Sequence, residues 1–211
     1  MMPTIEEYIK AAKVPRHLVP WQAWPYNAFV VPEKRPALLH PDKDFVVMCA
    51  ANETGIMRIN DDGFGGDVIM DDSRHEVLQH MPAILAARGR VLKTGLGMGC
   101  FVRAILLKDE VDHVDVVEID EKIIKHFGAQ FSDNPRVTVH HADALQWEPP
   151  EGAKYDLVWH DVWCEGNVGL SDLHTKLLRR FAKLAPKHGA WAYPRVVKKT
   201  LRRRGMKRLI G

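Results

Sequence analysis

The feature that most constrains this chain is the alternation of short apolar strands and helix patterns that begins after Gly89. Strands are predicted where apolar residues run together, and helices where they recur every three or four positions. The predicted strands are residues 90–94, 114–118, 137–140, 155–160 and 189–193, and the predicted helices are residues 100–108, 121–131 and 172–184. Such alternation is typical of a parallel sheet with helices on both faces. The sequence therefore predicts an α/β fold whose sheet ends after the fifth strand.

The residues ahead of this sheet predict smaller, separate features. Residues 1–43 combine a short helix, up to about residue 13, with a proline-rich arm that has little regular structure from residue 14 to residue 40. Residues 44–72 predict a small β-meander of three short strands. Ser73 followed by Glu76 has the spacing of a helix N-cap, which predicts a helix up to about residue 87. We expect residues 73–194 to form the main domain and residues 195–211 a tail.

Composition and cysteine spacing indicate the cellular compartment in which the protein is expected. No apolar run approaches the length of a membrane span, and the first residues lack the basic and apolar regions of a signal peptide. The three cysteines, Cys49, Cys100 and Cys164, are an odd number without CxxC spacing, so neither a disulfide framework nor a zinc site is encoded. We therefore expect a cytoplasmic protein with no membrane partner and no metal.

Charge is distributed unevenly along the chain. The net charge is +3, but residues 174–211 hold 13 of the 30 Lys and Arg and no Asp or Glu, which leaves 17 basic against 27 acidic residues, or −10, in the remainder. A basic end of this kind binds nucleic acid, an acidic partner or the acidic body of its own protein, or it is simply a solvated helix face and tail. These alternatives stay open from the sequence, as does a homodimer.

A glycine-rich loop joins the first predicted strand to the helix that follows. The loop consists of Gly95, Leu96, Gly97, Met98 and Gly99. Glycines at such a turn permit a tight bend and let a ligand approach the backbone. The dinucleotide fingerprint has Gly or Ala where this chain has Cys100, and no Lys followed by Ser or Thr completes a phosphate-binding P-loop. Both NAD and nucleoside triphosphates are therefore disfavoured as ligands.

Two carboxylates follow at the ends of the next predicted strands, where open α/β sheets bind their ligands. Glu118 ends the second strand, where a carboxylate can accept both hydroxyls of a ribose. Asp143 follows the third strand and can accept an adenine amino group, with the backbone N–H of Ala144 beside it as a donor to the ring. Either acid alone is also explained as a helix cap. Together with the loop they indicate an adenosine ligand without phosphates.

Residues 91–163 resemble the nucleotide-binding half of class I methyltransferases, particularly the spermidine synthase-like branch. The matching motifs are Val116-Val117-Glu118-Ile119-Asp120-Glu121 and Ala142-Asp143-Ala144, and a similar segment at residues 75–82 extends the resemblance back to about residue 45. The resemblance implies a Rossmann-like methyltransferase sheet with S-adenosylmethionine as cofactor, bound within residues 73–194. It also implies cofactor contacts from the glycine loop, Glu118, Ile119, Asp143 and Ala144.

The departures from spermidine synthases decide between reactions. Those enzymes usually carry an aspartate where this chain has Met98, and at the catalytic strand end they read Asp, two small residues, Asp, Pro, where this chain has Asp161-Val162-Trp163-Cys164-Glu165. Methyl transfer to an unidentified acceptor is therefore favoured over aminopropyl transfer. Two alternatives stay open: a spermidine synthase-like aminopropyltransferase, and a non-catalytic module that binds S-adenosylmethionine or nucleic acid.

The end of the fourth predicted strand supplies the catalytic candidates. Methyl transfer needs an acceptor aligned with the sulfonium and, for some acceptors, a group that takes a proton. Asp161, with His160 beside it, is our first choice for that group, at the border of the cofactor site. Trp163 is expected to line the cofactor site and to attract the sulfonium by about 0.5 to 2 kcal/mol. Alternatively, Asp161 caps a helix or turn, and Trp163 packs in the core.

Overall fold

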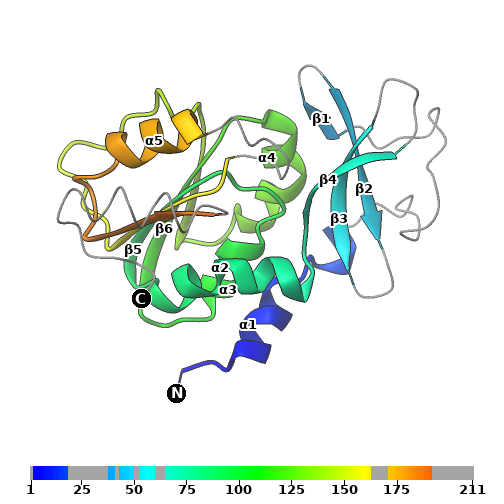
Figure 1. Ribbon diagram of the computed structural model, residues 1–211. Coiled ribbons are helices and arrows are strands. Elements are labelled where there is room, and N and C mark those ends of the chain that lie inside the picture. The colour runs from blue at the N-terminus through cyan, green and yellow to red at the C-terminus, as the bar shows by residue number, and fades with distance from the viewer. Residues whose placement is uncertain are drawn as a thin grey trace.

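The computed structural model describes residues 2–18, 38–40, 43–49, 53–59, 65–162 and 171–191. At its centre lies a five-stranded parallel sheet in the order β7-β6-β5-β8-β9 (Figure 1). Its strands are β5 (Gly89–Thr94), β6 (Val111–Glu118), β7 (Val137–His141), β8 (Leu157–His160) and β9 (Lys187–Ala190). The predicted Rossmann-like α/β sheet is confirmed, although β9 begins at Lys187 rather than at residue 189.

The order of the strands fixes where a ligand can bind. The chain proceeds from β5 outward to β6 and β7, and then returns to add β8 and β9 on the other side of β5. The connections after β5 and β8 therefore leave in opposite directions, which opens a crevice at the carboxyl ends of these two strands. The glycine loop follows β5 at this point, and Asp161 follows β8.

Helices pack on both faces of the parallel sheet. They are α1 (Ile5–Ala12), α2 (Arg74–Ala86), α3 (Cys100–Leu106), α4 (Glu121–Phe127) and α5 (Ser171–Arg180), with 3-10 turns η1 (Arg16–Leu18) and η3 (Gly128–Phe131). Successive side chains of a strand point to opposite faces. Trp159 of β8 points to α2, where its Nε1 donates to Nδ1 of His80 at 3.0 Å, whereas the ring of His160 lies 5.3 Å from that of Phe181, next to α5.

Most helix boundaries follow their sequence signals, but two predicted helices are shorter than expected, and α5 ends at Arg180 rather than at about residue 184. The predicted N-cap forms, because the backbone N–H of Glu76 donates to Oγ of Ser73 at 3.2 Å. The helix predicted over residues 121–131 is split, since its α-helical part ends at Phe127 and the remainder is the 3-10 turn η3. No helix among the described residues is long and apolar enough to cross a membrane.

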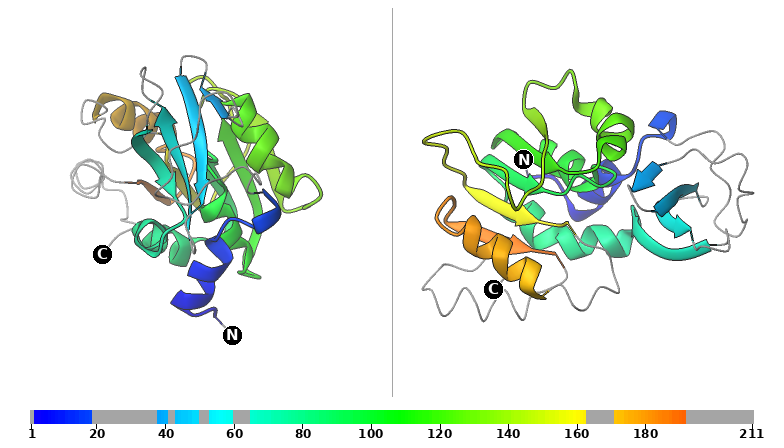
Figure 2. Two further views of the ribbon diagram at one scale, coloured as in Figure 1. Left: turned by 90° about the vertical axis from the view of Figure 1, so that its right-hand side faces the viewer. Right: turned by 90° about the horizontal axis from the view of Figure 1, so that it is seen from above.

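A second, antiparallel sheet precedes α2. Its strands β1 (Leu38–His40), β2 (Lys43–Cys49), β3 (Thr54–Ile59) and β4 (Gly65–Asp71) pair in sequence order, as a meander does. Figures 1 and 2 show this sheet at one end of the parallel sheet and α5 at the other. The expectation of an irregular arm up to residue 40 misses β1, which pairs with the outer edge of β2 and so satisfies backbone groups that an edge strand would leave open.

Asp72 joins α1, the meander and α2. Its side chain is almost fully buried, and its two oxygens accept the backbone N–H groups of Val14 at 2.8 Å and of Thr54 at 2.7 Å. Nζ of Lys13 lies 3.3 Å from the same carboxylate. Three segments that are distant in the sequence therefore share one charged hydrogen-bond acceptor.

Replacing Asp72 by alanine should destabilise the fold strongly, because two buried N–H groups lose their acceptor. We expect a loss of about 2 to 4 kcal/mol in the free energy of unfolding measured with urea. The matched control is Glu6→Ala, which removes the solvent-exposed pair of Glu6 with Arg74 between α1 and α2 and should cost under about 1 kcal/mol. Equal losses for the two variants would contradict the joining role of Asp72.

Candidate functional site

The glycine loop turns sharply between β5 and α3 and lies against the end of β8. Gly95 has a φ of +81°, and a Cβ at this position would overlap the carbonyl oxygen of Asp161. Its backbone N–H donates to the carbonyl of Val117 at 2.7 Å. Only glycine permits this backbone conformation and this close approach together. The loop is thereby held in the crevice between β5 and β8.

The far side of the loop is covered by a methionine from the meander. A Cβ on Gly97, whose φ is +55°, would collide with the thioether of Met70, the penultimate residue of β4. The sulfur of Met70 also accepts the backbone N–H of Met98 at 3.2 Å. The side chain of Met98 itself is fully buried, so it packs in the core and does not line the crevice.

Glu118 fastens the loop to the end of β6. Its Oε2 accepts the N–H of Leu96 at 2.6 Å, and its Oε1 accepts the N–H groups of Ile119 and Asp120, both at 2.9 Å. A carboxylate offers about four acceptor positions, so roughly one remains for a ligand hydroxyl. The predicted ribose contact stays a prediction, and the geometry adds a structural role that the sequence did not indicate.

The other predicted cofactor residues lie around the same edge of the sheet. The apolar side chain of Ile119 is 62% exposed directly after Glu118, where a flat ring could pack against it. Asp143 caps its own turn, since Oδ1 accepts the N–H of Leu145 at 2.8 Å, while Oδ2 lies 3.2 Å from the side-chain amide of Gln146. Ala144 is buried within that turn. These positions are compatible with the predicted adenosine contacts, which stay predictions.

The two predicted catalytic residues point to opposite faces of the sheet. Oδ2 of Asp161 is 2.8 Å from Nζ of Lys93, on the face covered by α2. His160 is fully buried on the other face, with its Nδ1 2.9 Å from Oγ1 of Thr94 and its Nε2 2.6 Å from Nε2 of His188. Adjacent residues of a strand alternate in direction, so the structure does not bring His160 and Asp161 together.

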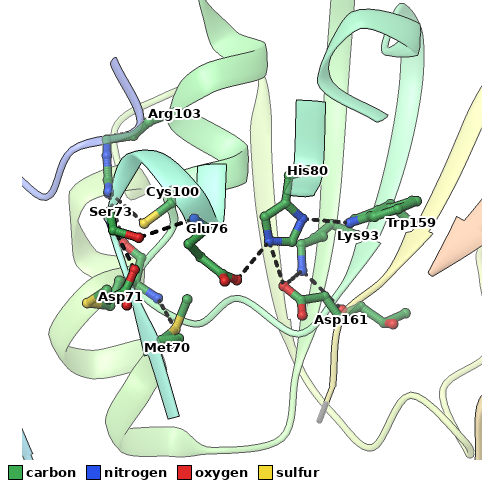
Figure 3. A network of polar contacts seen from close by, with 12 residues as sticks. Met70, Asp71, Ser73, Glu76, His80, Lys93, Cys100, Arg103, Trp159 and Asp161 are labelled. Atoms are coloured by element: carbon green, nitrogen blue, oxygen red, sulfur yellow. Dashed lines mark hydrogen bonds and ion pairs between the residues drawn. The ribbon is translucent and has the colours of Figure 1, made fainter. Parts of the chain in front are cut away.

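Two residues of α2 occupy the place expected for His160. Nε2 of His80 lies 3.4 Å from Oε1 of Glu76 and 3.8 Å from Oδ2 of Asp161, so the imidazole sits between two carboxylates (Figure 3). Glu76 and His80 are four residues apart and therefore share one face of the helix. That spacing, together with the strand lysine Lys93, is the signal that could have placed both residues in the site.

These side chains line a narrow pocket beside the glycine loop. The polar members are Glu76, His80, Lys93 and Asp161, and the remaining lining residues are Ala12, Met70, Val77, Ile84, Leu96, Cys100 and Phe101. The space between these side chains holds about one water molecule. Burial raises the pKa of the Cys100 thiol to about 11, so this cysteine is neither a thiolate nor a nucleophile at neutral pH.

Several predicted features lie outside the described residues. These are Trp163 with its expected aromatic wall, Cys164, and the basic tail at residues 195–211. Their roles therefore stay predictions.

The sequence of this chain matches the model of a known protein family. A family model described as AdoMet dependent proline di-methyltransferase matches residues 68–207, which is more than half of the chain. The chain belongs to this family. The matched residues include the glycine loop, Glu118 and the polar side chains of the pocket between α2 and β8. Membership confirms the predicted superfamily and S-adenosylmethionine as the cofactor.

Individual relatives are more distant and cover less of the protein. Polyamine aminopropyltransferase 2 of Ralstonia nicotianae is 32% identical over 117 residues, which are 50% of this chain and 23% of the relative. The polyamine aminopropyltransferase of Methanocaldococcus jannaschii is 33% identical over 102 residues, which are 45% of this chain and 34% of the relative. The chain thus spans about a quarter to a third of the length of these curated relatives.

Similar solved structures include methyltransferases and spermidine synthases. Spermidine synthase from Thermotoga maritima has 20% sequence identity and a TM-score of 0.38, covering 54% of this chain and 46% of that chain. The 23S rRNA methyltransferase ErmE has 24% identity and a TM-score of 0.38, covering 47% of this chain and 39% of that chain.

Glu118→Gln should loosen the glycine loop and weaken cofactor binding. An amide in place of the carboxylate offers fewer acceptor positions to the three N–H groups and loses the negative charge, so we expect S-adenosylmethionine to bind more weakly by about 1 to 3 kcal/mol in calorimetry. Asp143→Ala should weaken binding by a similar amount through the lost acceptor.

The control for both variants is Glu151→Gln, an exposed residue in the turn ahead of β8, which should leave the affinity unchanged. Unaltered affinity in folded Glu118→Gln or Asp143→Ala protein would assign that residue to turn capping alone.

Proposed function

We propose that this protein transfers methyl groups from S-adenosylmethionine to the secondary amine of proline, either the free amino acid or the first residue of a peptide. One observation supports this most directly. The residues matched by the proline di-methyltransferase family include both the glycine loop and the polar side chains of the pocket next to it, among them two carboxylates that suit an amine. Free and peptide-bound proline offer the same nitrogen to such a site.

The residues present suit the cofactor. The loop from Gly95 to Gly99 turns tightly through three glycines with positive φ at the carboxyl end of β5, and Glu118 retains acceptor capacity beside it. Ile119 adds an exposed apolar surface at the same edge. When bound, the cofactor supplies a methyl group on a sulfonium. The chain itself must position the acceptor in line with that group and exclude water.

The chemistry of proline explains why carboxylates are needed. An amine is protonated near neutral pH and then has no lone pair to donate. It must lose one proton before the first methyl transfer and a second proton before the next. Glu76 and Asp161 face the pocket and are the described carboxylates that line it. A site of this composition can stabilise the ammonium and receive its proton.

Aminopropyl transfer is the second candidate function. It is favoured by the curated relatives, which are polyamine aminopropyltransferases at 32% and 33% identity. Met98 argues against it, because the loop position that carries an aspartate in that branch is here an apolar side chain buried in the core. Binding of S-adenosylmethionine or nucleic acid without catalysis is the third candidate.

Further proposals concern location and partners. We propose a cytoplasmic protein whose basic tail, residues 195–211, contacts nucleic acid or an acidic partner, on the basis of its charge alone. Affinity for a single-stranded RNA probe should then fall steeply between about 50 and 200 mM salt. We also propose a homodimer, for which light scattering on the purified protein should give twice the mass of one chain.

The function is tested by titration and by mass spectrometry of products. We expect S-adenosylmethionine and S-adenosylhomocysteine to bind, and proline or a peptide with an N-terminal proline to gain up to two methyl groups. Gly95→Ala serves as the inactive control, because its Cβ would collide with the backbone of Asp161. Putrescine with decarboxylated S-adenosylmethionine forms the competing arm, and turnover there without proline methylation would overturn the proposal in favour of aminopropyl transfer.

A further inference from the structure

We infer that Glu76 is the catalytic residue that takes the proton from the acceptor amine, and that His80 is a positioning residue that holds its carboxylate. This role rests on the proposed function, because it requires an amine acceptor in the pocket. It departs from the sequence expectation, in which Asp161 takes the proton. The two carboxylates differ in the charge that each one faces.

The charge of Asp161 is compensated by a buried lysine. Lys93 belongs to β5 and is only 1% exposed, and its Nζ lies 2.8 Å from Oδ2 of Asp161 and 3.4 Å from the carbonyl of Thr94. An isolated ammonium at this depth would be very unfavourable, so the pair must stay together. Taking up a proton at Asp161 would leave Lys93 as a buried charge without a counter-ion. This cost disfavours Asp161 as the proton acceptor.

In the described part of the chain, Glu76 faces no such cation. Among the residues that the structure describes, no Lys or Arg nitrogen lies within ion-pairing distance of its carboxylate, whose nearest partner is Nε2 of His80 at 3.4 Å. Its side chain is 15% exposed and lines the pocket, so it is accessible to a small group. With His80 neutral, Glu76, Asp161 and Lys93 together carry a charge of −1, which one ammonium neutralises.

The proton on His80 is fixed by Trp159. The indole N–H can only donate, so Nδ1 of His80 must be the acceptor of their 3.0 Å hydrogen bond. The neutral imidazole therefore carries its hydrogen on Nε2, which points toward Glu76 and Asp161 (Figure 3). The ring can take no further proton without losing the bond to Trp159. His80 thus turns an N–H toward the carboxylates and is not a base.

Aromatic rings hold this imidazole in place. The rings of Phe101 and Trp159 lie edge-on to it with centroids 6.0 Å away, and Trp191 stacks at 6.4 Å. His80 itself is only 4% exposed. Such packing excludes water and keeps the direction of Nε2 constant, so the Glu76 carboxylate is oriented before an acceptor arrives.

The proposed step balances in atoms and charge. An N–H bond of the prolinium breaks, its proton goes to a Glu76 oxygen, and the electron pair remains on nitrogen. The nitrogen then forms the new N–C bond to the methyl group, and the electrons of the broken C–S bond stay on the cofactor sulfur. Glu76 returns its proton to solvent and repeats this once for the N-methyl product. After two methyl groups no N–H remains, so the sequence ends at the dimethylated amine.

The inference is tested first with Glu76→Gln, which keeps the size of the side chain and removes its basicity. With proline as acceptor we expect methyl transfer at pH 7 to fall by about 10²- to 10⁴-fold while S-adenosylmethionine affinity stays unchanged. The rate should rise with increasing pH, because a growing fraction of the amine is then neutral in water. The other titratable groups lining the pocket are His80, Lys93, Asp161 and Cys100, and all remain in this variant.

Two comparison variants separate the carboxylates. The double variant Lys93→Met with Asp161→Asn removes both charges of the ion pair together, and it should show a smaller loss without recovery at high pH, because Glu76 still takes the proton. Glu151→Gln should match the wild type. A loss confined to the double variant, with Glu76→Gln as active as the wild type, would transfer the role to Asp161.

Two readouts do not depend on turnover. Nitrogen NMR of histidine-labelled protein should show His80, identified by the signal missing in His80→Gln, protonated at Nε2 only; a proton on Nδ1 overturns the positioning role. Calorimetry with pyrrolidine in the presence of S-adenosylhomocysteine should give at least tenfold weaker binding to Glu76→Gln, and equal binding overturns the role of Glu76. Failure of the proposed function appears differently, as a wild-type protein that binds the cofactor but never methylates proline.

Discussion

The carboxyl edge of the parallel sheet depends on one buried carboxylate. Glu118 ends β6 and accepts N–H groups from the glycine loop on one side and from the start of α4 on the other. Hydrogen bonds to an ionised acceptor are stronger than neutral ones, and these donors offset the cost of burying the charge. The loop can therefore keep its tight course beside β8 before any ligand arrives, so less ordering is needed when the cofactor binds.

The buried pair of Lys93 and Asp161 acts on chemistry more than on stability. Removing two charges from water costs about as much as their attraction returns, so such pairs seldom add to the net stability of a fold. Among the residues that the structure describes, the pair leaves Glu76 as the pocket carboxylate that forms no ion pair with a Lys or Arg. Two acids at one site thereby acquire different roles from their surroundings, as environments commonly separate paired carboxylates in enzymes.

Local sequence signals predicted what depends on periodicity and turn chemistry. The strand and helix alternation, the loop from Gly95 to Gly99 and the Ser73 cap appear where they were expected. The pocket was only half predicted: the i, i+4 spacing of Glu76 and His80 places them on one face of α2, but no local pattern shows that this face meets Asp161 at the end of β8. His160 was expected beside Asp161, but strand alternation turns these neighbouring residues to opposite faces, and a catalytic role for His160 stays a prediction.

The contact of Met70 with the glycine loop connects the small meander to the site where the cofactor binds. A residue at the end of β4 touches the backbone that a cofactor must approach, and it lies two positions before Asp72, which joins three segments. We therefore expect local opening of the meander to depend on whether a cofactor occupies the loop. The protection of the meander amides against hydrogen exchange should then change when the cofactor binds.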